Sequence, residues 1–172
     1  MSRSSAEDWI DREHVNERGA RIGRLKWLEA NFPNLEIVVM DGGWLSHQLL
    51  EEAKYSFVHA QYIATCVLAL AEIERILAGR IFAIGVDAFE RASGEKLFSA
   101  ALEKGIISSE DASVIDEMRK LRNALIHFRR PLHDDTLEVR SIHKNIHPLF
   151  ELEQCAKRSL LAVFRILMAK SP

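Results

Sequence analysis

The chain has few cysteines and no apolar run long enough to cross a membrane. Its 172 residues include two cysteines, Cys66 and Cys155, too few for the disulfide framework of a small secreted protein. Both lie in apolar stretches with helical spacing, so we expect them to be buried, reduced thiols. The first 30 residues are charged and lack the apolar stretch of a secretory signal. These absences favour a cytoplasmic protein that does not enter a membrane.

The chain also lacks a large excess of one charge and a glycine-rich phosphate loop. Its formal net charge of -2 argues against a globally basic nucleic-acid binder. The charge is unevenly distributed, because residues 119–172 contain 11 Lys and Arg against 5 Asp and Glu. The segment Asp41-Gly42-Gly43 lacks the lysine and the preceding strand of a nucleotide-binding loop. A positive surface is therefore expected only near the C-terminal third of the chain.

Hydrophobic periodicity predicts an all-α fold in a single globular domain. The composition, 48% hydrophobic and 28% charged, suits a chain of this length with a sizeable core. Helical patterns cover residues 5–31, 44–78 and 148–170, with one or two shorter helices between 80 and 102. The 44–78 pattern predicts one long helix that stops at Gly79, and residues 35–40 form a short β-prone run. We therefore expect an N-terminal helix and extended arm at 1–43, followed by a helical domain at 44–172.

The most informative pattern is RNALIH at residues 122–127, inside another predicted helix. An apolar stripe at steps of three and four indicates the helix: Val114, Met118, Leu121, Leu125 and Phe128. Ser108 or Ser109 suits its N-cap, and Pro131 ends the pattern. At about 100° per residue, Asn123 and His127 project nearly opposite the stripe. We therefore expect the imidazole to point away from the core of its own chain.

This segment contains the side chains that metal-free cleavage of RNA requires. Histidine transfers protons near neutral pH, and arginine supplies a permanent positive charge for the phosphorane oxygens. Asn123 is four residues before His127, so its amide can hold the ring in one tautomer, which fits a structural role equally well. Arg122 lies about 140° around the helix from His127, and a symmetric dimer would relax this separation. A lone helical histidine is more often structural or solvent-facing, so that interpretation stays open.

The motif and its surroundings resemble the HEPN superfamily of all-helical domains. Nuclease members of that family carry an Arg, four to six residues and a His, commonly with a polar residue directly after the Arg. Here the pattern reads Arg122, Asn123, three apolar residues and His127. The likeness extends from about residue 44 to the C-terminus: a long central helix containing residues 71–77, a Gly-Ile-Ile turn at 105–107, the motif helix, a loop and a final amphipathic helix. The resemblance implies an up-down bundle of four to five helices.

The resemblance also implies a metal-independent endoribonuclease that works as a homodimer and needs no cofactor. Arg122, Asn123 and His127 of both protomers would then line a shared cleft. Glu72, close to the family's usual acidic position, is expected to anchor Arg122. Family members often serve as toxins or in defence, so RNA and an antitoxin protein are the implied partners. Some relatives no longer cleave, and a non-catalytic helical dimer that binds RNA, a nucleotide or a partner protein is the alternative.

Two further groups of residues bear on binding. Lys120, Arg129 and Arg130 can track a phosphate backbone, although they also fit a solvated helix end that complements its own dipole. A second group lies in a segment expected to be a loop or hairpin: His133, Asp134, Asp135, His143 and His147. Its spacing matches no compact zinc pattern, so no metal site is expected there. Within this segment, residues 136–142 are the one other candidate strand, which could pair with residues 35–40.

Overall fold

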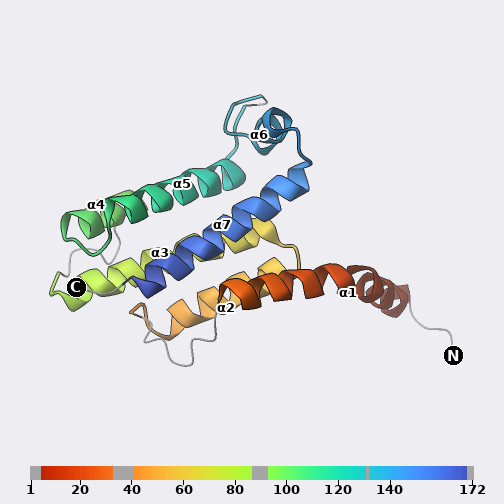
Figure 1. Cartoon of the computed structure of the whole chain (residues 1–172), viewed down its shortest axis with the longest axis horizontal. Coiled ribbons are helices and arrows are strands. Elements are labelled where there is room, and N and C mark those ends of the chain that lie inside the picture. Colours follow the sequence, from red (N-terminus) through yellow and green to blue (C-terminus); the bar gives the residue numbers. More distant parts are fainter. Residues whose placement is uncertain (1–4, 33–40, 87–92, 131, 170–172) are drawn as a thin grey trace.

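The computed structural model describes residues 5–32, 41–86, 93–130 and 132–169 (Figure 1). Seven helices and no strand occur in these residues: α1 (Ser5–Asn31), α2 (Trp44–Val58), α3 (Tyr62–Ala83), α4 (Gly94–Glu103), α5 (Ser109–Ile126), α6 (Leu137–Lys144) and α7 (Pro148–Met168). The prediction of an all-α fold is confirmed for this part of the chain. The β-prone run at 35–40 lies outside the described residues.

Helix α3 is the centre of the bundle. It packs against α2, α4, α5 and α7. Helices α2 and α5 lie on opposite sides of the α3–α7 pair and run antiparallel to it (Figure 1). The side chains that fill the centre have no more than 1% of their surface exposed: Ile73, Ile76, Leu77, Leu160, Val163 and Ile166. Burial of this apolar surface is the main stabilising contribution to the bundle.

The predicted single helix over 44–78 is wrong, because the chain turns back between α2 and α3. Ala60 adopts a left-handed backbone conformation, with φ of 58°. Two backbone hydrogen bonds close the turn: Ala60 N–H donates to the Phe57 carbonyl at 3.1 Å, and Gln61 N–H donates to the Ser56 carbonyl at 2.8 Å. Alanine rarely takes this conformation, so the sequence carries no signal for the break.

Gly79 is not the stop that the sequence predicts, because α3 continues to Ala83. A Cβ atom at this position would lie 2.0 Å from the Asp41 carbonyl oxygen. The glycine therefore permits a close approach between α3 and the chain before α2. The neighbouring Arg80 Nε donates to Asp41 Oδ2 at 2.7 Å and holds the same approach by a charged contact.

Helix α5 begins where the sequence predicts and ends earlier. Ser108 is the N-cap in a capping box: Asp111 N–H donates to Ser108 Oγ at 3.1 Å, and Ser108 N–H donates to Asp111 Oδ2 at 3.2 Å. The helix ends at Ile126, five residues before Pro131. Phe128 is 86% exposed, so the final member of the expected apolar stripe does not join the core.

Residues 137–144 form helix α6 and not the loop, hairpin or strand that the sequence suggested. Thr136 caps its first turn, and Asn145 ends it in the left-handed conformation. Glu151 lies on α7, is 1% exposed, and forms ion pairs with side chains of α6. Lys144 Nζ lies 2.7 Å from Glu151 Oε1 and 2.9 Å from Oε2. Helix α7 confirms the predicted final amphipathic helix.

Candidate functional site

The RNALIH segment lies at the exposed C-terminal end of α5. Arg122, just before the last turn, and Asn123, in the last turn, are half-buried, whereas His127 is exposed at the C-cap. The backbone N–H of His127 still donates to the Asn123 carbonyl at 3.0 Å. Its φ of -103° and ψ of 136° are extended, so the chain leaves the helix at this residue. The imidazole therefore reaches solvent, as the helical projection predicted, but from an extended residue.

Arg122 pairs with a carboxylate on α3. Its Nη2 lies 3.6 Å from Glu74 Oε1, and 26% of the arginine side chain is exposed. The Nε of Arg122 is buried without a hydrogen-bond partner. Glu72 was expected to anchor Arg122, and that expectation is wrong. Glu72 points into the core, where Ser46 Oγ donates to its Oε1 at 2.7 Å.

Glu74 lies between the Arg122 guanidinium and the positive N-terminal end of the α4 dipole. Besides Arg122, it faces the first turn of α4, because a Cβ built on Gly94 would lie 2.7 Å from Glu74 Oε1. The N-terminal dipole of α4 favours a carboxylate there. Burial raises the pKa of Glu74, and the nearby Arg122 charge opposes that rise. The arrangement holds Arg122 against α3 on one flank of α5.

The side chains of Arg122, Asn123 and His127 do not converge within one chain. No hydrogen bond or ion pair joins any two of these side chains in the described structure. The arginine is directed toward α3, and the imidazole lies beyond the end of the helix. The 140° separation expected from helical geometry is thus not overcome by a distortion of α5. A cleft that contains both an Arg122 and a His127 side chain would need a second copy of the chain to supply one of the two.

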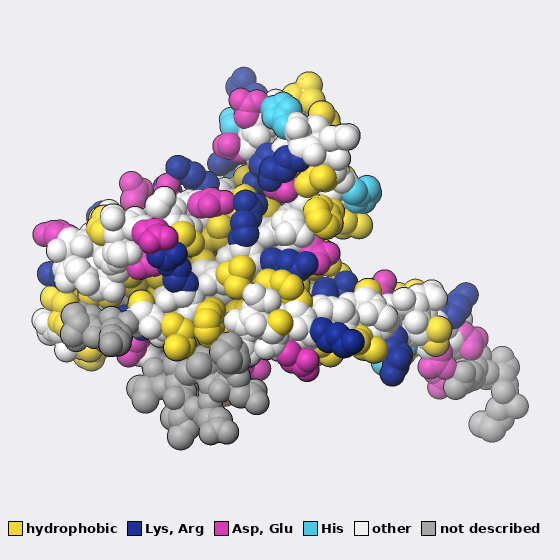
Figure 2. All heavy atoms as spheres, in the orientation of Figure 1, with side chains coloured by type: hydrophobic (Ala, Val, Ile, Leu, Met, Phe, Trp, Pro, Cys, Tyr) yellow, Lys and Arg dark blue, Asp and Glu magenta, His cyan; other side chains and the backbone are white. Residues whose placement is uncertain are grey.

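Most basic side chains of the C-terminal third are paired with acids. Lys120 Nζ lies 2.8 Å from Asp116 Oδ2. Arg158 contacts Glu117 at 3.1 Å and the buried Glu151 at 3.8 Å. Arg129 and Arg130 make no ion pair with a described residue. Figure 2 shows Lys and Arg side chains interleaved with acidic ones over this face, so the positive surface is narrower than the sequence charge suggests.

Large apolar side chains are exposed around the motif end. Ile126 and Phe128, which flank His127 in the chain, are 43% and 86% exposed. Exposed apolar residues continue on the loop, on α6 and at the start of α7: Leu132, Ile142, Leu149 and Phe150. An apolar surface of this kind is typical of an interaction site. We call these six residues the motif-end apolar surface.

Two of the histidines between 133 and 147 accept local backbone hydrogen bonds. His133 Nδ1 accepts from Asp135 N–H at 3.2 Å, and His147 Nδ1 accepts from Leu149 N–H at 3.2 Å as the cap of α7. No three His, Cys, Asp or Glu side chains within the described ranges are placed to hold a metal ion. None of the described helices is long and apolar enough to cross a membrane.

Sequence reasoning missed Glu74, the partner of Arg122. Glu72 and Glu74 are two residues apart on α3, and only the packing of α5 against α3 decides which of them meets Arg122. Comparison with protein-family models, curated protein sequences and solved structures finds no match to this chain. A functional assignment therefore depends on the residues of the chain itself.

Proposed function

We propose that the protein is a metal-independent endoribonuclease of the HEPN type that acts as a homodimer. One observation carries the proposal: an arginine, an asparagine and an exposed histidine lie within six residues at the C-terminal end of α5. Exposure leaves the His127 ring free to exchange protons with a substrate. Arg122 supplies a positive charge for the phosphate.

The proposed reaction is an internal attack within RNA. His127 of one protomer accepts the proton of a ribose 2′-hydroxyl while the 2′-oxygen forms a bond to phosphorus. The bond from phosphorus to the 5′-oxygen breaks, and His127 of the partner subunit donates a proton to that oxygen. Arg122 stabilises the negative charge on the phosphorane oxygens. The products are a 2′,3′-cyclic phosphate and a 5′-hydroxyl.

A second protomer fits the site for two reasons. Arg122 and His127 diverge on one copy of α5, so two copies supply a cation and an imidazole from opposite directions. The motif-end apolar surface also lies where such a partner would pack. Glu74 acts as a positioning residue, because its ion pair with Arg122 holds the guanidinium in place before RNA binds. In this proposal the protein acts as a toxin, with an antitoxin as its partner, or in defence, as HEPN members often do.

Cleavage of a total-RNA pool by purified protein with a chelator present tests the proposal. We expect His127→Ala and Arg122→Ala to lower the cleavage rate by at least about 100-fold each. Matched controls are His143→Ala, an exposed histidine on α6, and Arg119→Ala, which removes an arginine one turn earlier on α5 that pairs with Asp116. Both controls should retain the wild-type rate. Equal cleavage by all five proteins would overturn the catalytic assignment.

A non-catalytic helical dimer is the second candidate. It is favoured by the pairing of Arg122 with Glu74 and by the absence of side-chain contacts among the three motif residues in the described structure. In that case, the protein binds RNA, a nucleotide or a partner protein without cleaving it. Retention of labelled RNA without cleavage, lost in Arg122→Ala, would support this function over the first.

A further inference from the structure

The junction of α5, α6 and α7 gathers three basic side chains around one buried carboxylate. Glu151, in the first turn of α7, accepts hydrogen bonds from Lys144 Nζ at 2.7 Å and 2.9 Å. Arg158 Nη2 lies 3.8 Å from Glu151 Oε1, and Arg140 Nε lies 4.0 Å from the same oxygen. We call Arg140, Lys144 and Arg158 the junction cations. Their three positive charges surround a group that carries one negative charge.

Arg140 lacks good acceptors for its N–H groups. An arginine presents five N–H donors, but the 4.0 Å separation from Glu151 exceeds hydrogen-bond distance. The side-chain hydrogen bond that Arg140 makes goes to Cys155 Sγ at 4.0 Å, and a thiol sulfur is a weak acceptor. The Arg140 side chain is 17% exposed, enough for a ligand to touch it but too little for water to hydrate it fully. An anion here would supply the oxygen acceptors that the described residues do not.

Arg158 and Lys144 are the more accessible junction cations, with 40% and 47% of their side chains exposed. Arg158 Nη1 donates to Glu117 Oε1 on α5 at 3.1 Å, and Glu117 is 53% exposed. An ion pair this exposed contributes little stability, so a ligand oxygen can replace it. With Glu117 and Glu151 both counted, the ion pairs of the described residues leave one positive charge of the junction cations unbalanced.

The junction cations lie close to the RNALIH segment. Helix α6 lies beside the C-terminal end of α5 and the start of α7 (Figure 1). The contact with Glu117 places Arg158 beside α5 at a point ten residues before His127, which is about 15 Å along a helix. Figure 2 shows Lys and Arg side chains on the visible face where these three helices meet. A strand held at the RNALIH segment needs only a short stretch to reach the junction cations.

We propose that the junction cations bind a phosphate group of the RNA strand that the RNALIH segment cleaves, an inference that rests on the proposed function. The guanidinium groups of Arg140 and Arg158 donate to the phosphate oxygens, which are better acceptors than the Cys155 sulfur. Glu151 stays paired with Lys144 and holds the three side chains together. A phosphodiester carries one negative charge and so balances the positive charge left over. Because these contacts reach only the backbone, they position the strand without reading its sequence.

Binding of an RNA oligonucleotide with a 2′-O-methyl group at every position tests the proposal, because this RNA lacks the hydroxyl that attacks phosphorus. We expect Arg158→Gln and Arg140→Gln each to raise its dissociation constant by at least about 10-fold and to reduce the salt dependence of binding. The matched control is Arg119→Gln, which removes an α5 arginine that pairs with Asp116 and should keep the wild-type affinity. The exposed Arg158 is the safer position for folding and decides the test if Arg140→Gln does not fold. Wild-type affinity in Arg158→Gln would overturn the phosphate site.

Inorganic phosphate distinguishes an RNA strand from a free phosphate as the ligand. The expected result is that Arg158→Gln weakens RNA binding whether or not phosphate alone stabilises the protein. Suppose instead that phosphate raises the melting temperature of the wild type but not of Arg158→Gln, while both proteins bind the oligonucleotide equally. That result would assign the site to free phosphate and overturn the RNA assignment.

Cleavage kinetics keep the failure of this inference distinct from the failure of the proposed function. Arg158→Gln should raise KM for RNA and leave kcat close to the wild-type value, because Arg158 does not touch the reacting atoms. Binding of the methylated RNA that depends on Arg158, in a protein that cleaves no RNA, would support the phosphate site and count against the ribonuclease. Cleavage that requires His127 but has the same KM in Arg158→Gln would do the reverse.

Discussion

Glu72 and Glu74 lie two residues apart on α3 and have opposite environments. Glu72 is completely buried, and its Oε2 has no hydrogen-bond partner. Burial raises its pKa to about 7, against the opposing effects of the Ser46 hydrogen bond and the Arg75 charge. Glu74 instead reaches the surface of α3 and meets Arg122. The family resemblance named Glu72 as the anchor of Arg122, whereas the structure pairs Arg122 with Glu74, because the choice between the two acids depends on the rotation of α3 against α5.

The raised pKa of Glu72 predicts a stability that falls as pH increases. Between the ordinary value of 4.5 and about 7, the folded protein keeps a proton that the unfolded chain releases. The free energy of unfolding should therefore decrease over this interval, by at most about 3 kcal/mol. Glu72→Gln keeps an acceptor for Ser46 and removes the titration. Denaturant unfolding at pH 4.5, 6 and 8 should give a flatter stability profile for this variant, and identical profiles would refute the explanation.

Some helix ends can be predicted from the sequence, and others cannot. The start of α5 was predictable because a polar side chain, Ser108, supplies the cap locally. The break before α3 was not, since it depends on Ala60 in a conformation that alanine seldom adopts. Gly79 was misread as a stop because its role, close contact with the Asp41 carbonyl, involves a distant segment. Local signals thus identified α5, whereas tertiary contacts set the boundaries of α2 and α3.

The cap of α5 gives a prediction at the scale of one element. Ser108→Ala removes the hydroxyl that accepts from Asp111 N–H and should lower the free energy of unfolding by about 1 kcal/mol. Ser109→Ala is the matched control, because Ser109 is an adjacent exposed serine in the first helical position. Its effect should be within a few tenths of a kcal/mol. Equal losses for both variants in chemical denaturation would show that the capping hydroxyl is not what stabilises the helix start.

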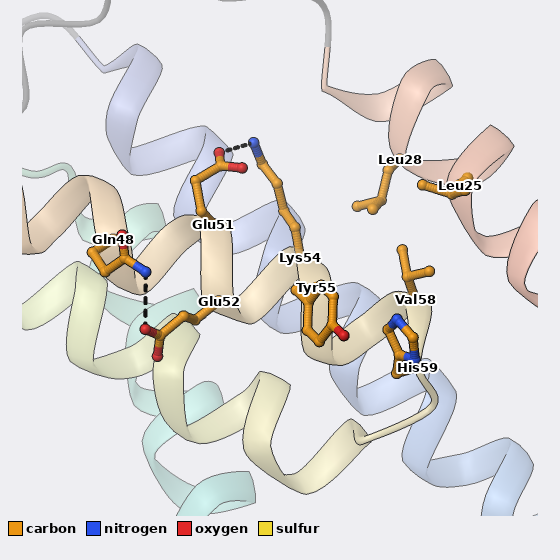
Figure 3. A pocket seen from close by; sticks show the side chains of 9 residues that line it. All are labelled: Leu25, Leu28, Gln48, Glu51, Glu52, Lys54, Tyr55, Val58 and His59. Carbon is orange, nitrogen blue, oxygen red and sulfur yellow. Dashed lines mark hydrogen bonds and ion pairs between the residues drawn. The ribbon is translucent and has the colours of Figure 1, made fainter. Parts of the chain in front are cut away.

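The packing of the bundle leaves the RNALIH segment at one end of the molecule, where α5 ends (Figure 1). Packing of α2, α3, α5 and α7 buries the centre and leaves the C-terminus of α5, α6 and the start of α7 with exposed apolar and charged side chains. The all-α fold followed from periodicity, whereas the exposure of His127 comes from the chain leaving the helix at this residue, which the predicted longer helix did not include. The projection of the N-terminal part of α1 beyond the bundle (Figure 1) and the groove between α1 and α2 (Figure 3) could not be predicted, because the apolar residues of α1 form no continuous stripe.

The structure of the RNA products tests the central proposal most directly. RNA should be cleaved by the purified protein in excess chelator, and the 3′ ends of the fragments should then be identified chemically. Attack by the 2′-oxygen with His127 as the proton acceptor predicts 2′,3′-cyclic phosphate ends that disappear in His127→Ala. Fragments ending in a 3′-hydroxyl, or cyclic phosphate ends produced equally by His127→Ala, would contradict the proposed site.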